Sequence, residues 1–254
     1  MQQETILMAD KKVALITGAN RGLGFETARQ LGQEGVVVVL GARQLKSAEE
    51  AAAKLKADGI EAHGIQLDVT KAADRSAAAK YFDERYGRLD ILINNAGIAS
   101  VGEGDLMKPT VIETPEAEMQ GVYHTNVISV VLLTHELLPL LKKSPAGRIV
   151  NLSSILGSLT LHADPESPIY SFKKFAYNSS KTALNAFTIH LAWELKDTPI
   201  KVTSVHPGWV KTEMGTDAAP MEIPEGAQTS VAAALLAADA PSGRFIHLGQ
   251  ELPW

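Results

Sequence analysis

Two tyrosines within one short stretch of the sequence each have a lysine four residues later. In YSFKKFAYNSSK (residues 170–181), Tyr170 precedes Lys174 and Tyr177 precedes Lys181. On a helix, positions i and i+4 lie on one face, and a cation beside a phenol lowers the phenol pKa. Because an unperturbed phenol with a pKa of about 10 is a sluggish acid near neutrality, such a pair is a candidate for acid–base chemistry. Taken alone, a tyrosine followed by a lysine four residues later is more often a pair of surface side chains without a catalytic role.

A glycine-rich turn near the start of the chain indicates a nucleotide site. TGANRGLG (residues 17–24) stands between an apolar run and a helical pattern. Gly18, Gly22 and Gly24 allow the backbone to turn tightly and approach a diphosphate, which the following helix N-terminus attracts. The spacing G-x3-G-x-G differs from the usual G-x-G-x-x-G, so a glycine-rich turn without a ligand is the alternative interpretation.

The residues at the end of the second apolar run favour a phosphorylated nucleotide. A free ribose 2′-hydroxyl requires an Asp or Glu about 20 residues after the glycines, but residues 40–43 contain no acid and end in Arg43. Arg43, together with Arg21 in the glycine loop, can pair with a 2′-phosphate. The alternative interpretation is that both arginines are solvated surface residues without a ligand. We therefore predict NADP(H) rather than NAD as the cofactor.

Polar residues also follow the third and fourth apolar runs. Asp68 and Val69 end the third run, where an adenine ring would lie, and NNAG (residues 94–97) ends the fourth. An Asp at such a place is often only a cap, and Asn with Gly often only forms a turn. These segments support a nucleotide site through their position rather than their composition.

Seven apolar runs alternate with helical patterns along the chain, which is typical of a parallel sheet with both faces covered. The runs occupy residues 12–18, 36–43, 61–69, 89–94, 147–154, 200–208 and 243–249, and the helical patterns residues 25–35, 45–59, 71–86, 116–143, 177–196 and 227–238. No linker or internal repeat divides the chain. We predict an α/β fold, a single-domain, Rossmann-type, doubly wound parallel sheet of about seven strands with helices on both faces. One dinucleotide-binding and catalytic domain is expected over residues 1–254, with residues 1–10 as a flexible N-terminal extension.

The composition narrows the classes of function. The 254 residues are 45% hydrophobic, carry a net charge of −5 and include no cysteine. The negative charge argues against nucleic-acid binding, and the absence of cysteine excludes disulfides and a thiol nucleophile. The N-terminus lacks the features of a secretory signal, and the most apolar stretch, residues 127–141, is too short to span a bilayer. We therefore expect a cytoplasmic protein without membrane or nucleic-acid partners. The histidines show no ligand spacing, so no metal site is predicted.

Taken together and in this order, the motifs resemble the short-chain dehydrogenase/reductase family. The shared features are TGANRGLG, the pair Asp68 and Val69, NNAG, Asn126 in a long helix, a strand ending in NLSS, YNSSK and PGWVKT. The resemblance covers nearly the whole chain. It is nearest to the NADPH-dependent carbonyl reductases, because of Arg21, Arg43 and the segment between Ser154 and Tyr177.

The resemblance implies a role for each motif residue. Tyr177 would be the general acid that protonates a carbonyl oxygen, and Lys181 would lower the tyrosine pKa and bind the nicotinamide ribose. Ser154, rather than Ser153, would polarise the carbonyl, and Asn126 would hold a water in a proton relay. The residues expected to bind the cofactor are Gly18, Asn20, Arg21, Gly22, Leu23, Gly24, Arg43, Asp68, Val69, Asn95, Ala96, Gly97, Tyr177, Lys181, Pro207, Gly208, Val210 and Thr212.

The intervening residues favour Tyr177 over Tyr170. Between Tyr177 and Lys181 lie Asn, Ser and Ser, which are small enough for a cofactor to lie against the helix, whereas Ser, Phe and Lys separate Tyr170 from Lys174. The position around the helix does not distinguish the two tyrosines, because residues 170 and 177 would share a stripe of one helix. Tyr170 is then expected to form a wall of the substrate pocket.

Three functions remain open at this point. The first is an NADPH-dependent reductase of ketones or aldehydes. The second is an NAD(P)-dependent alcohol, sugar or steroid dehydrogenase of the same family, and the third is a nucleotide-sensing regulator without turnover. The expected partner is a small carbonyl or alcohol substrate. The resemblance leaves a homodimer, a homotetramer and a monomer open. Leu156, Met214 and the loop after Thr212 are expected to form a substrate lid.

Overall fold

The computed structural model describes residues 11–101 and 111–254. The expected extension at residues 1–10 lies outside this range. The chain forms one eight-stranded sheet in the order β3-β2-β1-β4-β5-β6-β7-β8. The strands are β1 (Val13–Thr17), β2 (Val37–Ala42), β3 (Ala62–Gln66), β4 (Ile91–Asn94), β5 (Arg148–Leu152), β6 (Lys201–Val205), β7 (Arg244–His247) and β8 (Gln250–Glu251). The predicted doubly wound sheet is confirmed.

The eighth strand is the difference from the expected seven. Neighbouring strands pair in parallel from β3 to β7, and only β8 runs antiparallel, to β7. β8 consists of two exposed polar residues, Gln250 and Glu251. A strand this short has neither an apolar run nor an alternating pattern that the sequence could reveal.

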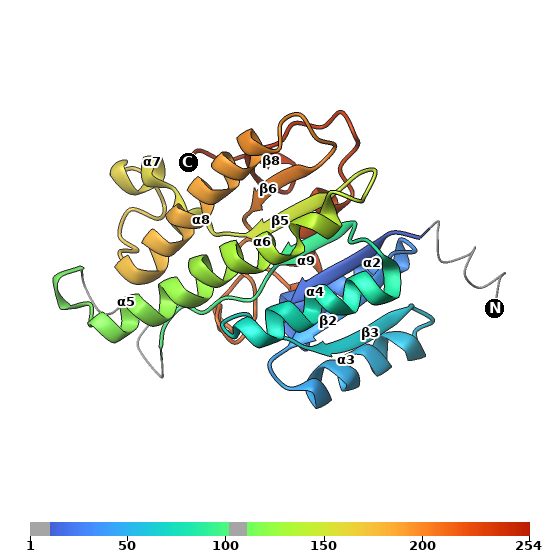
Figure 1. Ribbon diagram of the computed structural model, residues 1–254. Coiled ribbons are helices and arrows are strands. Elements are labelled where there is room, and N and C mark those ends of the chain that lie inside the picture. The colour runs from blue at the N-terminus through green and yellow to red at the C-terminus, as the bar shows by residue number, and fades with distance from the viewer. Residues whose placement is uncertain (1–10, 102–110) are drawn as a thin grey trace, which may run out of the picture.

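Helices cover both faces of the sheet (Figure 1). The α-helices are α2 (Gly22–Gln33), α3 (Leu45–Ala57), α4 (Ala72–Tyr86), α5 (Glu116–Tyr123), α6 (Ser129–Leu141), α7 (Leu159–Ala163), α8 (Phe175–Glu194) and α9 (Ile223–Ala234). Three shorter elements are η1 (Val111–Glu113), η2 (His124–Ile128) and η3 (Ile155–Gly157). The sequence did not predict η3 and α7, which lie in the segment before Tyr177.

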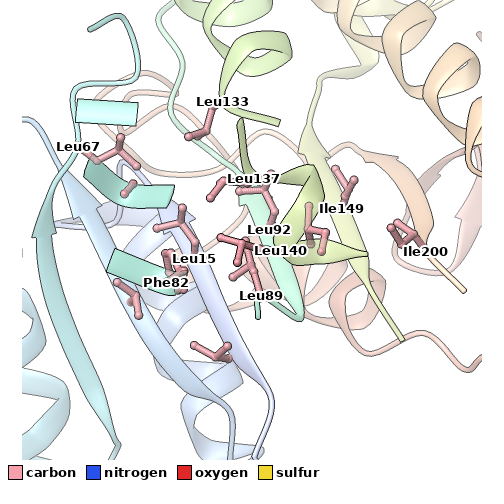
Figure 2. Close-up of a cluster of buried hydrophobic side chains, with 14 of the residues drawn as sticks. Leu15, Leu67, Phe82, Leu89, Leu92, Leu133, Leu137, Leu140, Ile149 and Ile200 are labelled. Carbon is pink, nitrogen blue, oxygen red and sulfur yellow. The ribbon is translucent and has the colours of Figure 1, made fainter. Parts of the chain in front are cut away.

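Alternate residues of each central strand enter two separate cores, as the two-residue period of a strand requires. Leu15, Leu92 and Ile149 of β1, β4 and β5 pack with residues of α4, α6 and α8, and Figure 2 shows many of these side chains, including Phe82 of α4. On the opposite face, residues such as Ile16 pack with α2, α3 and α9. Both faces of the sheet are therefore buried, which is why its strands read as continuous apolar runs.

The longest helical run crosses one face of the sheet. α5, η2 and α6 continue without a break over Glu116–Leu141, 26 residues that are long and apolar enough to cross a membrane by length and composition. The prediction that residues 127–141 are too short to span a bilayer concerned only part of this run, because the helix begins before that apolar stretch. α6 buries Leu133, Leu137 and Leu140 against the sheet, as a core helix does. Among the described residues, no other helix meets that criterion.

The topology gathers the predicted site at one edge of the sheet. The glycine loop, Arg43, Asp68, NNAG, Ser154 and PGWVKT each follow the carboxyl end of one of the strands β1 to β6, in that order. Parallel strands have their carboxyl ends at the same edge, and ligands of such sheets bind where the strand order reverses. Here the order reverses between β1 and β4.

Candidate active site

The glycine loop between β1 and α2 requires its glycines for two different reasons. Gly18 and Gly22 have positive φ angles of 62° and 57°, which side chains rarely tolerate. Gly24 is needed for space, because a methyl group there would lie 2.5 Å from Nδ2 of Asn95 and 2.7 Å from the carbonyl oxygen of Gly18. α2 begins without a side-chain cap at Arg21, so the N–H groups of its first turn face the loop and favour an anion.

NNAG joins the end of β4 to the end of β1. The backbone N–H groups of Asn95 and Ala96 donate to Oγ1 of Thr17 at 3.0 and 2.9 Å, and Nδ2 of Asn95 donates to the carbonyl oxygen of Thr17 at 2.7 Å. Asn95 therefore locks the two strand ends together, which brings Ala96 and Gly97 beside the glycine loop.

The basic residues predicted to recognise a phosphate lie near this loop. Arg43 is exposed directly after β2, and Arg21 forms an ion pair with Glu213 at 2.6 Å. Burial alone would raise the pKa of Asp68, but hydrogen bonds from Thr70 and the charges of Lys71 and Arg43 lower it. Arg43 and Asp68 are therefore neighbours at the same edge of the sheet.

Asp68 and Val69 also stabilise the turn that leads into α4. Oδ1 of Asp68 accepts from the backbone N–H of Thr70 at 3.1 Å and from its Oγ1 at 2.7 Å. The carbonyl oxygen of Val69 accepts from Arg75 at 2.9 Å. The carboxylate thus closes the turn after β3, while α4 itself begins after Lys71 without a side-chain cap.

Tyr177 and Lys181 lie on α8 and meet at the end of β5. Nζ of Lys181 is 5.6 Å from the centroid of the Tyr177 ring and donates to the carbonyl oxygen of Leu152 at 2.6 Å. A methyl group at Gly97 would lie 3.6 Å from the same Nζ. The lysine therefore bridges the tyrosine and the NNAG turn.

Burial shifts the pKa values of both groups. It raises the pKa of Tyr177 to about 12, with a smaller opposing effect from a hydrogen bond with Ser154. It lowers the pKa of Lys181 to about 8. Lys181 was expected to lower the tyrosine pKa, but burial raises that pKa, and the opposing effect comes from the hydrogen bond with Ser154. The phenol consequently keeps its proton at neutral pH.

The two serines at the end of β5 have different surroundings. Oγ of Ser153 donates to Oδ1 of Asn185 at 2.7 Å inside the protein. Oγ of Ser154 accepts from the backbone N–H of Leu156 at 3.2 Å and also hydrogen-bonds with Tyr177. The geometry supports the choice of Ser154 as the serine that faces a substrate.

Asn126 lies in η2, a π-helical turn within the long helix, and such turns are frequent at functional sites. Its Oδ1 accepts from the N–H of Ile98 at 2.9 Å, and its Nδ2 donates to the carbonyl oxygen of Ile98 at 2.8 Å and to Oγ of Ser180 at 3.0 Å. These contacts fix the chain after NNAG against α8, and the expected role of Asn126 in holding a water stays a prediction.

Tyr170 does not share a helix with Tyr177, so the expectation of a common stripe is wrong. α8 begins at Phe175 with Lys174 as its N-cap residue, and Tyr170 precedes it in a turn. Nζ of Lys173 lies 4.5 Å from the centroid of the exposed Tyr170 ring. The first Tyr–Lys spacing is therefore not a helical i, i+4 pair.

PGWVKT (residues 207–212) follows β6 and packs beside the glycine loop. Gly208 has a φ of 93°, and a methyl group there would lie 2.6 Å from Sδ of Met221. Buried Val210 forms a β-bridge with Met221, while Pro207 and Thr212 are half-buried. Asn20 and Leu23 are also half-buried within the glycine loop and the first turn of α2.

Most of the sequence matches a known family. The profile described as short chain dehydrogenase matches residues 12–223. The chain belongs to the short-chain dehydrogenase family. The resemblance proposed from the motifs is thereby confirmed.

Relatives of this short-chain dehydrogenase are similar over most of their length. It is 33% identical to short-chain dehydrogenase/reductase 1 of Saponaria officinalis, over all of both chains. It is 32% identical to (−)-isopiperitenone reductase of Mentha piperita, over 95% of this chain and 98% of the relative. The NADPH-bound carbonyl reductase structure from chicken fatty liver has a TM-score of 0.82 and 29% identity, over 96% of this chain and 99% of that one.

In this short-chain dehydrogenase, the segment before α8 contacts α8 and neighbouring elements through residues that no sequence motif marks. Nε2 of His162 lies 3.0 Å from the carbonyl oxygen of Leu156 and 3.2 Å from Nδ2 of Asn178. The carbonyl oxygen of Trp254 accepts from the N–H of Thr160 at 2.9 Å. No spacing in the sequence signals these contacts, because each joins residues through tertiary packing.

A cavity of about 450 Å³ lies along α8, between this segment and α5. Its lining includes Tyr123, Leu159, His162, Phe175 and Thr182, but neither Tyr177 nor Ser154. Among the described residues, no group of three His, Cys, Asp or Glu is placed to hold a metal ion.

Proposed function

We propose that the protein is an NADPH-dependent carbonyl reductase that acts on ketones or aldehydes, with Tyr177 as the general acid. As a short-chain dehydrogenase, the chain is an NADP(H)-dependent oxidoreductase that acts on alcohol and carbonyl groups. The observation that carries the finer proposal is the contact of Tyr177 with both Ser154 and Lys181 beside the glycine loop.

The residues present fit the cofactor. Gly18 and Gly22 turn the backbone with positive φ angles, and the first turn of α2, which has no side-chain cap, is open toward a diphosphate. Arg21 and Arg43 provide the positive charge that a 2′-phosphate requires, and Lys181, beside Gly97, would hold the nicotinamide ribose. When bound, NADPH supplies the hydride.

The protein's own groups would supply the proton and the electrostatic stabilisation. Tyr177 holds its proton at neutral pH because its pKa is about 12, which is the state that carbonyl protonation needs. The Ser154 hydroxyl would donate to the carbonyl oxygen and stabilise the negative charge that develops there. Lys181, with a pKa of about 8, is mostly charged at neutral pH and would stabilise the phenolate left after proton transfer.

Oxidation of an alcohol would require the tyrosine as a base, whereas the protonated phenol is the form that takes part in reduction. Two relatives share this direction in their names, (−)-isopiperitenone reductase and salutaridine reductase of Papaver somniferum. (+)-Neomenthol dehydrogenase of Capsicum annuum, at 32% identity, represents the alternative direction.

The direct test is NADPH oxidation with a panel of aldehydes, ketones, quinones and sugars, repeated with NADH. We expect turnover of at least one carbonyl class, with NADPH preferred. Tight NADPH binding with no turnover on any member would instead support the nucleotide-sensing regulator. Turnover only of alcohols with NADP⁺ would support the dehydrogenase alternative.

A further inference from the structure

An ion pair joins the glycine loop to the segment that follows PGWVKT. Arg21 contacts Oε2 of Glu213 at 2.6 Å, and both side chains are largely exposed, at 68% and 74%. The neighbouring Thr212 lies against the same loop, since a methyl group at Gly22 would be 4.0 Å from its Cγ2. The pair therefore fastens this segment to the loop in which the diphosphate is proposed to bind.

The guanidinium group of Arg21 therefore has two competing anionic partners. Under the proposed function it pairs with the 2′-phosphate of NADPH, and in the structure it pairs with the carboxylate of Glu213. A phosphate monoester carries more negative charge than a carboxylate and accepts the same forked donors. A carboxylate held at this arginine would also repel the arriving phosphate. Full contact with the phosphate therefore requires Glu213 to leave.

The segment around Glu213 is anchored at its base and, beyond it, by a hydrogen bond from Nε1 of Trp209 to the carbonyl oxygen of Gly215 at 2.8 Å. Lys211 donates its N–H to the carbonyl oxygen of Met221 at 2.9 Å, and Met221 donates to that of Trp209 at 3.2 Å. Between these anchors most residues are exposed. Thr216 has a φ of 60°, which is a strained conformation for a β-branched residue. Loss of the Arg21 contact would allow this part of the chain to relax.

We propose that Glu213 competes with the 2′-phosphate of NADPH for Arg21, so that recognition of this phosphate releases residues 213–219 from the glycine loop. The inference rests on the proposed cofactor and deepens it. It makes Glu213 a specificity-determining residue that weakens NADPH binding without affecting NADH. It also couples cofactor recognition to the segment that was expected to form the substrate lid.

The first test compares Glu213 with a second exposed glutamate, which lies just after this segment. Glu222 forms an exposed ion pair with Lys211, away from the glycine loop, and is the matched control. Dissociation constants of NADPH and NADH are measured by fluorescence titration at low salt for the wild type, Glu213→Gln and Glu222→Gln. We expect Glu213→Gln to tighten NADPH by about 1.5- to 5-fold, the range of an exposed ion pair, with NADH unchanged. Glu222→Gln should change neither constant.

The second test follows the segment itself. The N–H of Gly215 donates to Oγ1 of Thr212 at 3.1 Å, and that of Thr216 to the carbonyl oxygen of Thr212 at 2.8 Å. Adenosine 2′,5′-bisphosphate, which has no nicotinamide, should speed hydrogen exchange at these amides in the wild type. Adenosine 5′-monophosphate should not, and Glu213→Gln should exchange fast without any ligand.

The outcomes separate this inference from the proposed function. If the wild type binds NADPH but Glu213→Gln leaves its affinity unchanged, or tightens NADH equally, the competition is refuted while the reductase proposal stands. Unchanged exchange on addition of the bisphosphate refutes the release of the segment. Failure of the wild type to bind NADPH would overturn both proposals.

Discussion

Tyr177 combines a raised pKa with a nearby lysine whose own pKa is lowered, and burial causes both shifts. Ser154 shares a hydrogen bond with the phenol, whereas Ser153 is directed into the protein toward Asn185. The surroundings of each side chain, rather than its residue type, therefore distinguish the proposed catalytic serine from the serine beside it. The same holds for Tyr170, whose cation is Lys173.

Replacement of the two tyrosines tests this distinction. Tyr177→Phe should lower kcat for carbonyl reduction by about 10²- to 10⁴-fold, the usual contribution of a general acid, while NADPH binding is retained. Tyr170→Phe, the matched control, should keep kcat close to the wild-type value because its hydroxyl is not needed for chemistry. Steady-state kinetics and a cofactor titration measure both effects. A fully active Tyr177→Phe enzyme would contradict the assignment.

The lowered pKa of Lys181 predicts a pH dependence of activity. The lysine is charged below its pKa of about 8 and neutral above it, while Tyr177, with a pKa of about 12, stays protonated over the working range. We expect kcat for reduction to fall as the pH rises through about 8, because the cation that stabilises the phenolate is lost. Measurement of kcat from mildly acidic to alkaline pH with saturating NADPH checks this. A rate that is constant throughout would contradict it.

The same shift acts on stability with the opposite sign. The folded-state pKa of Lys181 is about 8 and the ordinary value 10.5, so the unfolded chain binds more protons between these values. This group therefore makes the free energy of unfolding rise with pH in that window. Above pH 8, kcat should therefore fall while the contribution of Lys181 to the free energy of unfolding rises.

At the scale of elements, the glycine loop and NNAG form one unit, because Asn95 occupies the space that Gly24 leaves open. The sequence predicted both motifs, since each carries residues with special backbone requirements at a strand end. It could not predict η3 and α7, because the segment before Phe175 has no sustained helical period and its contacts with Leu156 and Asn178 are tertiary. The contacts of Asn126 with Ile98 and Ser180 are also tertiary and could not be predicted from the sequence.

Gly24→Ala tests the unit formed by this loop. The added methyl group would lie 2.5 Å from Asn95, so we expect a loss of about 1–3 kcal/mol in the free energy of unfolding and weaker NADPH binding. Gly35→Ala is the control, because a methyl group at residue 35 would meet no atom within 4 Å, although the backbone there has a φ of 80°. It should cost about 1–2 kcal/mol through backbone strain alone. Urea denaturation and cofactor titration measure both properties, and equal NADPH affinities for the two variants would contradict the role of the loop.

At the scale of the whole molecule, the two edges of the sheet have different tasks. The carboxyl edge carries the candidate site, and at the amino edge Arg148, the first residue of β5, ties several segments together. Its guanidinium donates to the carbonyl oxygens of Leu236 at 2.6 Å, Ala237 at 3.2 Å and Pro199 at 3.3 Å. This arginine connects the end of α9 with the chain that enters β6, and it is remote from the proposed chemistry.

Arg148→Met should therefore reduce stability without changing the site. We expect the free energy of unfolding to fall by about 1–3 kcal/mol, because several partly buried carbonyl groups lose their partner, while KM for NADPH is unchanged. The control Arg244→Met removes only an exposed ion pair with Glu251 and should cost less than about 1 kcal/mol. Urea denaturation measures both, and a raised KM in Arg148→Met would show that the two edges are coupled.

The π-helical turn η2 (His124–Ile128) has a consequence for how the longest helical run of this chain is compared with those of its relatives. A turn with hydrogen bonds from i to i+5 holds one residue more than an α-helical turn. One residue corresponds to about 100° of rotation around an α-helix. Residues of α6 are therefore out of phase with those of α5, and a single helical wheel drawn through Glu116–Leu141 would assign one half to the wrong side. An alignment that places a gap at this turn would preserve the phase of both halves.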